Sequence, residues 1–138
     1  MAGLHWIGIP EFAAALERTT ARASAESRVF VAEAAASIEA IAKDHASGRP
    51  GPEVVTGTLR RGITHDPIQP WGVGGWRTKV GPTVIYSRRI ELGFHGTDSR
   101  GRHYNARGYP YFEPAFRSVA ATLPRIWRLH MRIATVGL

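Results

Sequence analysis

The chain has 138 residues, of which 43% are hydrophobic, and it contains no cysteine. This length suits one domain with a real core, so we treat residues 1–138 as a single domain. The lack of thiols excludes a disulfide scaffold and thiolate metal sites, and it suits a reducing cytoplasm. Residues 1–10 lack the basic start and apolar run of a leader, and no stretch reaches the roughly 20 apolar residues of a membrane span. We therefore expect a soluble protein with neither a signal peptide nor a membrane anchor.

The net charge of +7 is unevenly placed along the chain. Residues 1–50 carry five Lys or Arg against six Asp or Glu, whereas residues 51–138 carry thirteen against five. Sixteen of the 18 basic residues are arginine, whose planar side chain can hold phosphate or carboxylate at two points. The second half could therefore face a polyanion, although a GC-rich genome also enriches arginine and alanine.

Residues 1–48 contain one long predicted helix. Pro10 suits the first helical turn, and Gly48 followed by Pro50 and Pro52 ends the pattern near Ala46. Apolar residues recur mostly three or four apart, at Phe12, Leu16, Ala23, Phe30, Ala34, Ile38 and Ile41. At 1.5 Å per residue such a helix reaches about 50 Å. That length predicts packing against a neighbouring subunit.

Residues 54–112 predict strands and loops. Residues 54–66 and 76–80 have the pattern of strands, residues 71–76 that of a glycine-rich hairpin connection, and Gly81-Pro82 that of a turn. Residues 83–86 predict a third strand or lead into a helical turn over residues 87–92. Residues 94–108 are polar, basic and glycine-bearing, which predicts a long loop.

Residues 113–135 predict a C-terminal helix that starts at Glu113-Pro114. Its apolar period runs through Phe116, Val119, Leu123, Trp127, Met131 and Ala134. Pro124 falls inside this period and should kink the helix or split it in two.

Catalytic chemistry finds little support in the sequence. His95, Asp98 and His103 share one loop, and a metal-dependent nuclease would need such residues to converge on a divalent cation. No pair of carboxylates or G-x-S-x-G signature stands out, and Glu91 beside Arg88 and Arg89 predicts a structural ion pair. We expect no metal, no cofactor and no enzymatic activity. Arginines interleaved with Trp and Tyr leave non-specific DNA binding as an alternative.

Four short motifs give a more specific signal. They are T-G-T-L-R-R-G-I at residues 56–63, V-G-P at 80–82, Y-S-R-R-I-E-L-G at 86–93 and Y-P-Y-F-E-P-A at 109–115. Their order resembles that of the neck, or tail-completion, proteins of siphophages (head–tail connector proteins), over roughly residues 10–135. The resemblance implies an α+β fold with a long N-terminal helix, a small twisted antiparallel sheet and a kinked C-terminal helix. Pro124 and the basic segment 94–108 depart from the family pattern.

The resemblance also implies a structural virion protein that is assembled in the host cytoplasm and forms a ring in the phage neck. The ring would hold six copies by analogy with tail symmetry, or twelve by analogy with the connector. Its partners would be head-completion or connector proteins, tail terminator or tube proteins, and genomic DNA passing through the lumen, with no membrane. A tail terminator ring that caps the tail tube is a further alternative. The motif residues expected to serve structure or subunit contacts are Thr56, Gly57, Leu59, Arg60, Gly81, Tyr86, Arg89, Glu91, Gly93, Tyr109, Pro110, Tyr111 and Pro114.

Overall fold

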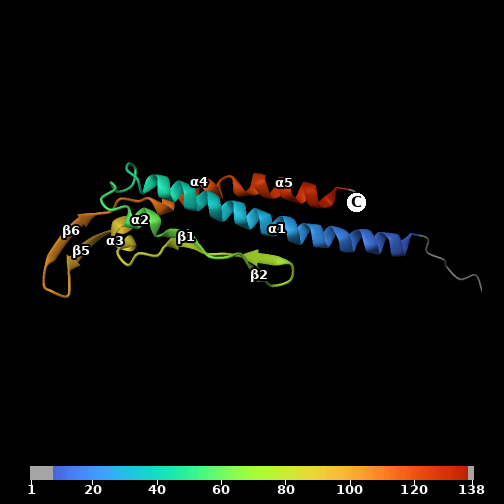
Figure 1. The fold of residues 1–138 in the computed structure, drawn as a ribbon, viewed down its shortest axis with the longest axis horizontal. Coiled ribbons are helices and arrows are strands. Elements are labelled where there is room, and N and C mark those ends of the chain that lie inside the picture. Colours follow the sequence, from blue (N-terminus) through green and yellow to red (C-terminus); the bar gives the residue numbers. More distant parts are fainter. Residues whose placement is uncertain (1–7, 137–138) are drawn as a thin grey trace, which may run out of the picture.

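The computed structural model describes residues 8–136 and has an α+β fold built on one long helix (Figure 1). Helix α1 (Ile9–His45) has Pro10 in its first turn and is closed by Ala46, whose backbone N–H bonds to the carbonyl of Ala42. Its 37 residues correspond to about 55 Å. The predicted long helix is confirmed.

Helices α4 (Phe112–Ala120) and α5 (Leu123–Thr135) pack along one side of α1, and short strands lie along its other side (Figure 1). These two helices are the halves of the predicted C-terminal helix. Pro124 lies in the first turn of α5, where the missing N–H costs little, and the preceding helix ends before it. The predicted split at Pro124 is confirmed.

Six short strands form three separate two-stranded ladders. The pairs are β1 (Ile63–His65) with β4 (Val80–Pro82), β2 (Gln69–Trp71) with β3 (Gly75–Arg77), and β5 (Gly93–Thr97) with β6 (His103–Arg107). All three are antiparallel, as predicted, but within residues 8–136 they do not join into one sheet. The β2–β3 hairpin is held on α1 instead, because the indole N–H of Trp76 donates to the carbonyl oxygen of Ser24 at 2.9 Å.

Three local predictions are wrong. Of the strand predicted over 54–66 only the end, β1, is a strand, and a helical turn α2 (Thr58–Arg61) precedes it, because the N–H groups of Arg61 and Gly62 bond back to Gly57 and Thr58. Gly81-Pro82 lies in β4 rather than in a turn; proline is tolerated there because the ladder has only two strands. The loop predicted over 94–108 is instead the β5–β6 hairpin, which spans residues 93–107. For residues 83–86 the sequence left two alternatives, a third strand or a lead into a helical turn. Helix α3 (Ser87–Leu92) confirms the second.

The core lies at the C-terminal end of α1. It consists of Ala42 from α1, Ala46 just after its end, Leu59 from α2, Ile63 from β1, and Tyr111 and Ala115 around the start of α4. The two alanines leave room for α2, β1 and α4 to approach α1 closely. At this end of the molecule α1, α2, β1 and the start of α4 therefore pack against one another.

Candidate functional site

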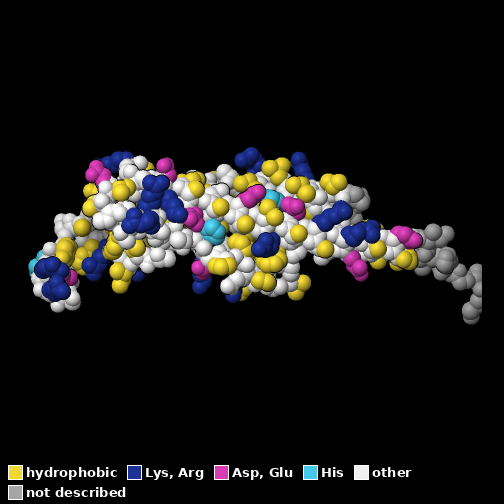
Figure 2. Space-filling model, viewed as in Figure 1, with side chains coloured by type: hydrophobic (Ala, Val, Ile, Leu, Met, Phe, Trp, Pro, Cys, Tyr) yellow, Lys and Arg dark blue, Asp and Glu magenta, His cyan; other side chains and the backbone are white. Residues whose placement is uncertain are grey.

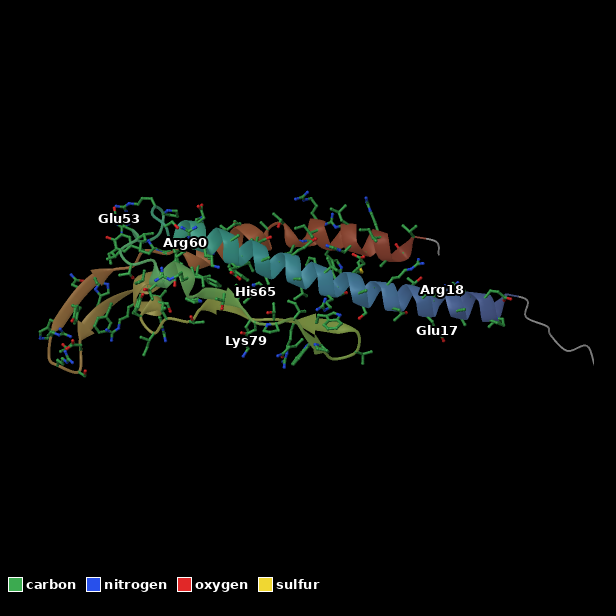
Figure 3. The ribbon with its side chains drawn as sticks, in the orientation of Figure 1. Glu17, Arg18, Glu53, Arg60, His65 and Lys79 are labelled. Atoms are coloured by element: carbon green, nitrogen blue, oxygen red, sulfur yellow. The ribbon has the colours of Figure 1, made fainter. Side chains whose placement is uncertain are left out.

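Three of the four sequence motifs meet at this end of α1. We call residues 56–63, 86–93 and 109–115 together the motif junction. Leu59, Ile63, Tyr111 and Ala115 share its core, and Ile90 is packed against them. The remaining motif, residues 80–82, adjoins the junction, because Pro82 is paired with Ile63 and Gly81 with Thr64 in the β1–β4 ladder. Figure 3 shows Arg60 near the junction, at the opposite end of α1 from Glu17 and Arg18.

Glu91 caps helix α4 from a distant part of the sequence. One carboxylate oxygen accepts hydrogen bonds from the backbone N–H groups of Tyr111 at 2.9 Å and Phe112 at 3.0 Å. The other accepts the N–H of Glu113 at 2.9 Å. A carboxylate at this position also opposes the positive end of the helix.

Pro114 completes the cap. A helix leaves about four N–H groups at its start without partners inside the helix. At the start of α4, Glu91 satisfies those of Tyr111, Phe112 and Glu113, and Pro114 has no N–H to satisfy. The predicted ion pair between Glu91 and the neighbouring arginines is wrong, because the carboxylate is turned toward the helix backbone instead.

A small cavity opens beside the motif junction. Its volume is about 130 Å³, and Thr56, Gly57, Leu59, Arg60 and Tyr86 contribute to its lining. The Thr56 hydroxyl accepts the backbone N–H of Thr58 at 3.3 Å, and Gly57 has a φ of 72° just before α2. These five predicted residues therefore lie together, as the approach to α2 and one wall of the cavity.

The other predicted residues connect α3 to the segments around it. The Arg89 guanidinium lies 4.4 Å from the centre of the Phe94 ring. Gly93 has a φ of 78°, and a Cβ there would overlap the carbonyl oxygen of Ala106. The N–H of Tyr109 donates to the carbonyl of Ile90 at 2.7 Å, and Pro110 is exposed between Tyr109 and the buried Tyr111.

His130 is a site that the sequence did not single out. Its side chain is 10% exposed, and its Nδ1 and Nε2 lie 2.6 and 2.9 Å from carboxylate oxygens of Glu26 and Glu33. Only the protonated ring donates from both nitrogens, so the hydrogen bonds to Glu26 and then Glu33 raise the pKa of His130. The ring links α5 to α1 across about one hundred residues of sequence, a separation that no local pattern could reveal.

We predict a pH-dependent contribution of His130 to stability. Because its pKa is higher in the folded chain, the contribution is complete below the unfolded pKa of about 6.5 and is lost as the pH rises through the folded pKa. Urea denaturation should show that His130→Gln lowers the free energy of unfolding more at pH 6 than at pH 9. Glu33→Gln should reduce this pH dependence; an equal effect of His130→Gln at both pH values would contradict it.

The three residues considered for a metal-dependent nuclease do not converge. His95 pairs with Asn105, His103 lies 2.8 Å from the Thr97 hydroxyl, and Asp98 is bonded to Arg102. Among residues 8–136 no three His, Asp or Glu side chains are close enough to share a metal ion. In the same part of the chain, no helix has the length and apolar character needed to cross a bilayer.

Apolar side chains lie exposed where α1 extends past its neighbours. Residues 9–21 of α1, which we call the projecting segment, reach beyond α5 and the β2–β3 hairpin (Figure 1). On it, Ile9, Phe12 and Leu16 are 51%, 63% and 49% exposed. Their spacing of three and four places them on one face. We call this face the apolar stripe.

A second exposed apolar face runs along α5. Leu129, Ile133 and Val136 are spaced by four and three residues and are 49%, 58% and 70% exposed. Ile133 and Val136 also line a groove of about 470 Å³ between α5 and Arg22 of α1. Figure 2 shows hydrophobic side chains on the surface along α5 and near the end of α1. Both faces resemble parts of an interface more than the surface of a monomer.

Comparison of the chain with protein-family models, with curated proteins and with solved structures finds no match.

Proposed function

We propose that this chain is a structural subunit of a ring in the neck of a siphophage, which joins the head connector to the tail and lets DNA pass. The order of the four motifs supports this proposal. So does their packing, because three of them meet in one junction where Glu91 of one motif caps the helix started by another. The motif residues then serve as architecture, as expected for a subunit that assembles rather than reacts.

The apolar stripe is the observation that most strongly supports assembly. A helix of about 12–15 residues is marginal in water by itself, and the projecting segment has no other element of residues 8–136 along its outer end (Figure 1). Leaving Ile9, Phe12 and Leu16 in water also forgoes their burial, which stabilises by roughly 1.5–3 kcal/mol for a fully buried side chain. A second copy that covers the stripe would supply both the packing and the burial.

The total surface supports the same proposal. The chain exposes 10107 Å², whereas a compact monomer of 15.1 kDa exposes about 7,100 Å². The nine residues outside 8–136 would add at most about 1,400 Å² if fully exposed. The remaining excess of roughly 1,600 Å² is the size of a standard protein–protein interface.

A contact between the apolar stripe of one copy and the α5 face of the next would be heterologous. Such a contact repeats around an axis and closes into a ring when the rotation allows it. It uses different surfaces on each subunit, which fits the two separate apolar faces of this chain. The proposed ring has six or twelve copies.

Native mass spectrometry of the full chain tests the assembly. The wild type should form a closed oligomer, and Phe12→Asp with Leu16→Asp should yield monomers, because two charges would be buried in the contact. Arg18→Asp is the matched control, since it makes the same change in net charge on the opposite side of α1. A wild type that stays monomeric, or a control that dissociates as fully as the stripe variant, would contradict the proposal.

Cross-linking can locate the contact because the natural chain has no cysteine. Copies carrying Phe12→Cys mixed with copies carrying Ile133→Cys should form mixed disulfide dimers, which require Cα atoms within about 7 Å. Absence of these dimers while the oligomer persists would exclude this pairing of faces. Pull-down with connector proteins rather than tube proteins would separate a neck ring from a tail terminator.

A further inference from the structure

The β5–β6 hairpin projects from the molecule as an arm. It extends beyond α3 at the end opposite to the projecting segment (Figure 1), and all five residues of β6 are exposed. A two-stranded hairpin is marginally stable in water unless other contacts hold it. The contacts within this arm therefore indicate what its surface is built to present.

Asp98 orders the tip of the arm, and its carboxylate is occupied by the hydrogen bonds that it accepts there. One carboxylate oxygen accepts the backbone N–H groups of Arg100 and Arg102, each at 2.9 Å, and the other accepts the Arg102 Nε–H at 2.7 Å. These hydrogen bonds lower the pKa of Asp98, and the one from the backbone N–H of Arg102 has the largest effect. Asp98 is the only carboxylate of residues 93–108, and it is engaged internally. Within residues 8–136, Arg100 and Arg107 have no carboxylate partner within 4.0 Å.

Guanidinium groups cover the apolar face of the arm. The rings of Phe94 and Tyr104 pack 5.6 Å apart across the two strands. Arg89 lies over the Phe94 ring at 4.4 Å, and Arg102 lies over the Tyr104 ring at 5.8 Å. A guanidinium stacked on an aromatic ring keeps N–H groups at its edge for other acceptors. Arg102 is paired with Asp98, so Arg89 supplies the cationic donors of this face, which has little bare apolar surface for docking a protein.

The opposite face of the arm is polar and has no acidic side chain. His95 pairs with Asn105, and His103 pairs with Thr97, across the same two strands. The tip between them carries Arg100. Figure 2 shows basic side chains, in dark blue, gathered at this tip, and the only basic residues of segment 93–108 besides histidine are arginines. Arg107 lies opposite Gly93 on this polar face and is exposed. The arm thus presents arginine on both faces and at its end.

We propose that the β5–β6 hairpin binds the phosphodiester backbone of double-stranded DNA, without sequence preference. Arginine donors match phosphate oxygens, and non-specific binding depends on such contacts. The inference deepens the proposed function and rests on it only for the source of the DNA, the genome that passes through the ring. A few phosphate contacts per subunit bind weakly enough at physiological salt to let the duplex slide.

Fluorescence anisotropy of a labelled duplex of about 30 base pairs, titrated with the full chain over a series of salt concentrations, tests this inference. Arg100→Gln with Arg107→Gln should reduce the slope of log K against log salt by about 2 and weaken binding about tenfold at low salt. The matched control is Arg128→Gln with Arg132→Gln, which removes the same charge from exposed positions of α5. Its slope should stay at the wild-type value.

Equal losses in the hairpin variant and the α5 control would overturn the inference, because net charge alone would then explain the binding. Binding of polyglutamate in place of the duplex, lost in the same variant, would assign the arm to an acidic protein surface instead. The outcome is separable from that of the proposed function. A ring whose DNA binding ignores the hairpin leaves the neck proposal intact, whereas a monomer that binds DNA through the hairpin leaves this inference intact.

Discussion

Replacing Tyr111 with alanine should lower the free energy of unfolding by about 4 kcal/mol, the usual cost of deleting a buried aromatic ring. Tyr111 is 0% exposed and is the largest fully buried side chain of the described residues. Its ring fills the space between Leu59, Ile63 and Ala115, so truncation leaves a cavity where three motifs meet. Urea denaturation followed by circular dichroism measures the loss.

Tyr111→Phe is the informative control for this variant. The Tyr111 hydroxyl is buried and, among the described residues, has no hydrogen-bond partner of ordinary geometry, although Ser87 lies nearby. Burial, and next the charge of Glu91, raises the pKa of Tyr111 to about 12, so the hydroxyl stays neutral. Phenylalanine should therefore be neutral or stabilise by up to about 1 kcal/mol. A loss as large as that of the alanine variant would show that the hydroxyl is bonded after all.

Replacing Glu91 with alanine should cost about 3 kcal/mol and lower the melting temperature by roughly 10 °C. Three backbone N–H groups at the start of α4 lose a charged acceptor, and no other side chain of the described residues bonds to them. Assembly should weaken with stability, since Glu91 fixes the direction in which α4 leaves the junction. Thermal denaturation at neutral pH measures the shift.

Glu91→Gln keeps one acceptor oxygen but removes the charge, so about half of the loss should remain. Glu113→Gln is the matched control, because the ion pair of Glu113 with Arg117 has side chains that are 58% and 77% exposed. Exposed pairs of this kind contribute less than about 1 kcal/mol. If both glutamine variants destabilised the chain equally, the capping role of Glu91 would be refuted.

Periodicity and proline predicted the long N-terminal helix and the C-terminal helices well. The spacing of apolar residues and the prolines at both ends located α1, and Pro124 predicted the break between α4 and α5. These signals work because a helix is governed by contacts three and four residues apart and by backbone N–H groups that proline lacks. The two ends of a helix can be predicted from the sequence for the same reason.

The strands, and the capping of α4 by Glu91, were harder to predict from the sequence. The alternating pattern of residues 54–66 concealed a helical turn at Thr58–Arg61, because four residues fit either period. The hairpin over residues 94–108 depends on Asp98 bonding to its own turn. The bonds of Glu91 to Tyr111 and of His130 to Glu26 join residues 20 and 104 positions apart, which sequence spacing alone does not encode.

The motif residues divide into two groups by their surroundings. Leu59, Tyr111, Glu91 and Gly93 are tied to packing, to a helix cap or to a backbone conformation. Arg60 and Tyr86 are exposed beside the cavity at the junction. The first group should matter through stability and the second through contacts with neighbouring molecules. Both groups fit the proposed ring subunit.

Imaging of purified virions by electron microscopy, with gold-labelled antibody against this chain, tests the neck assignment most directly. The proposal predicts label at the junction of head and tail, on a ring of density that is absent from particles made without the chain. Virions that lack the chain, or label that lies elsewhere on the particle, would contradict it.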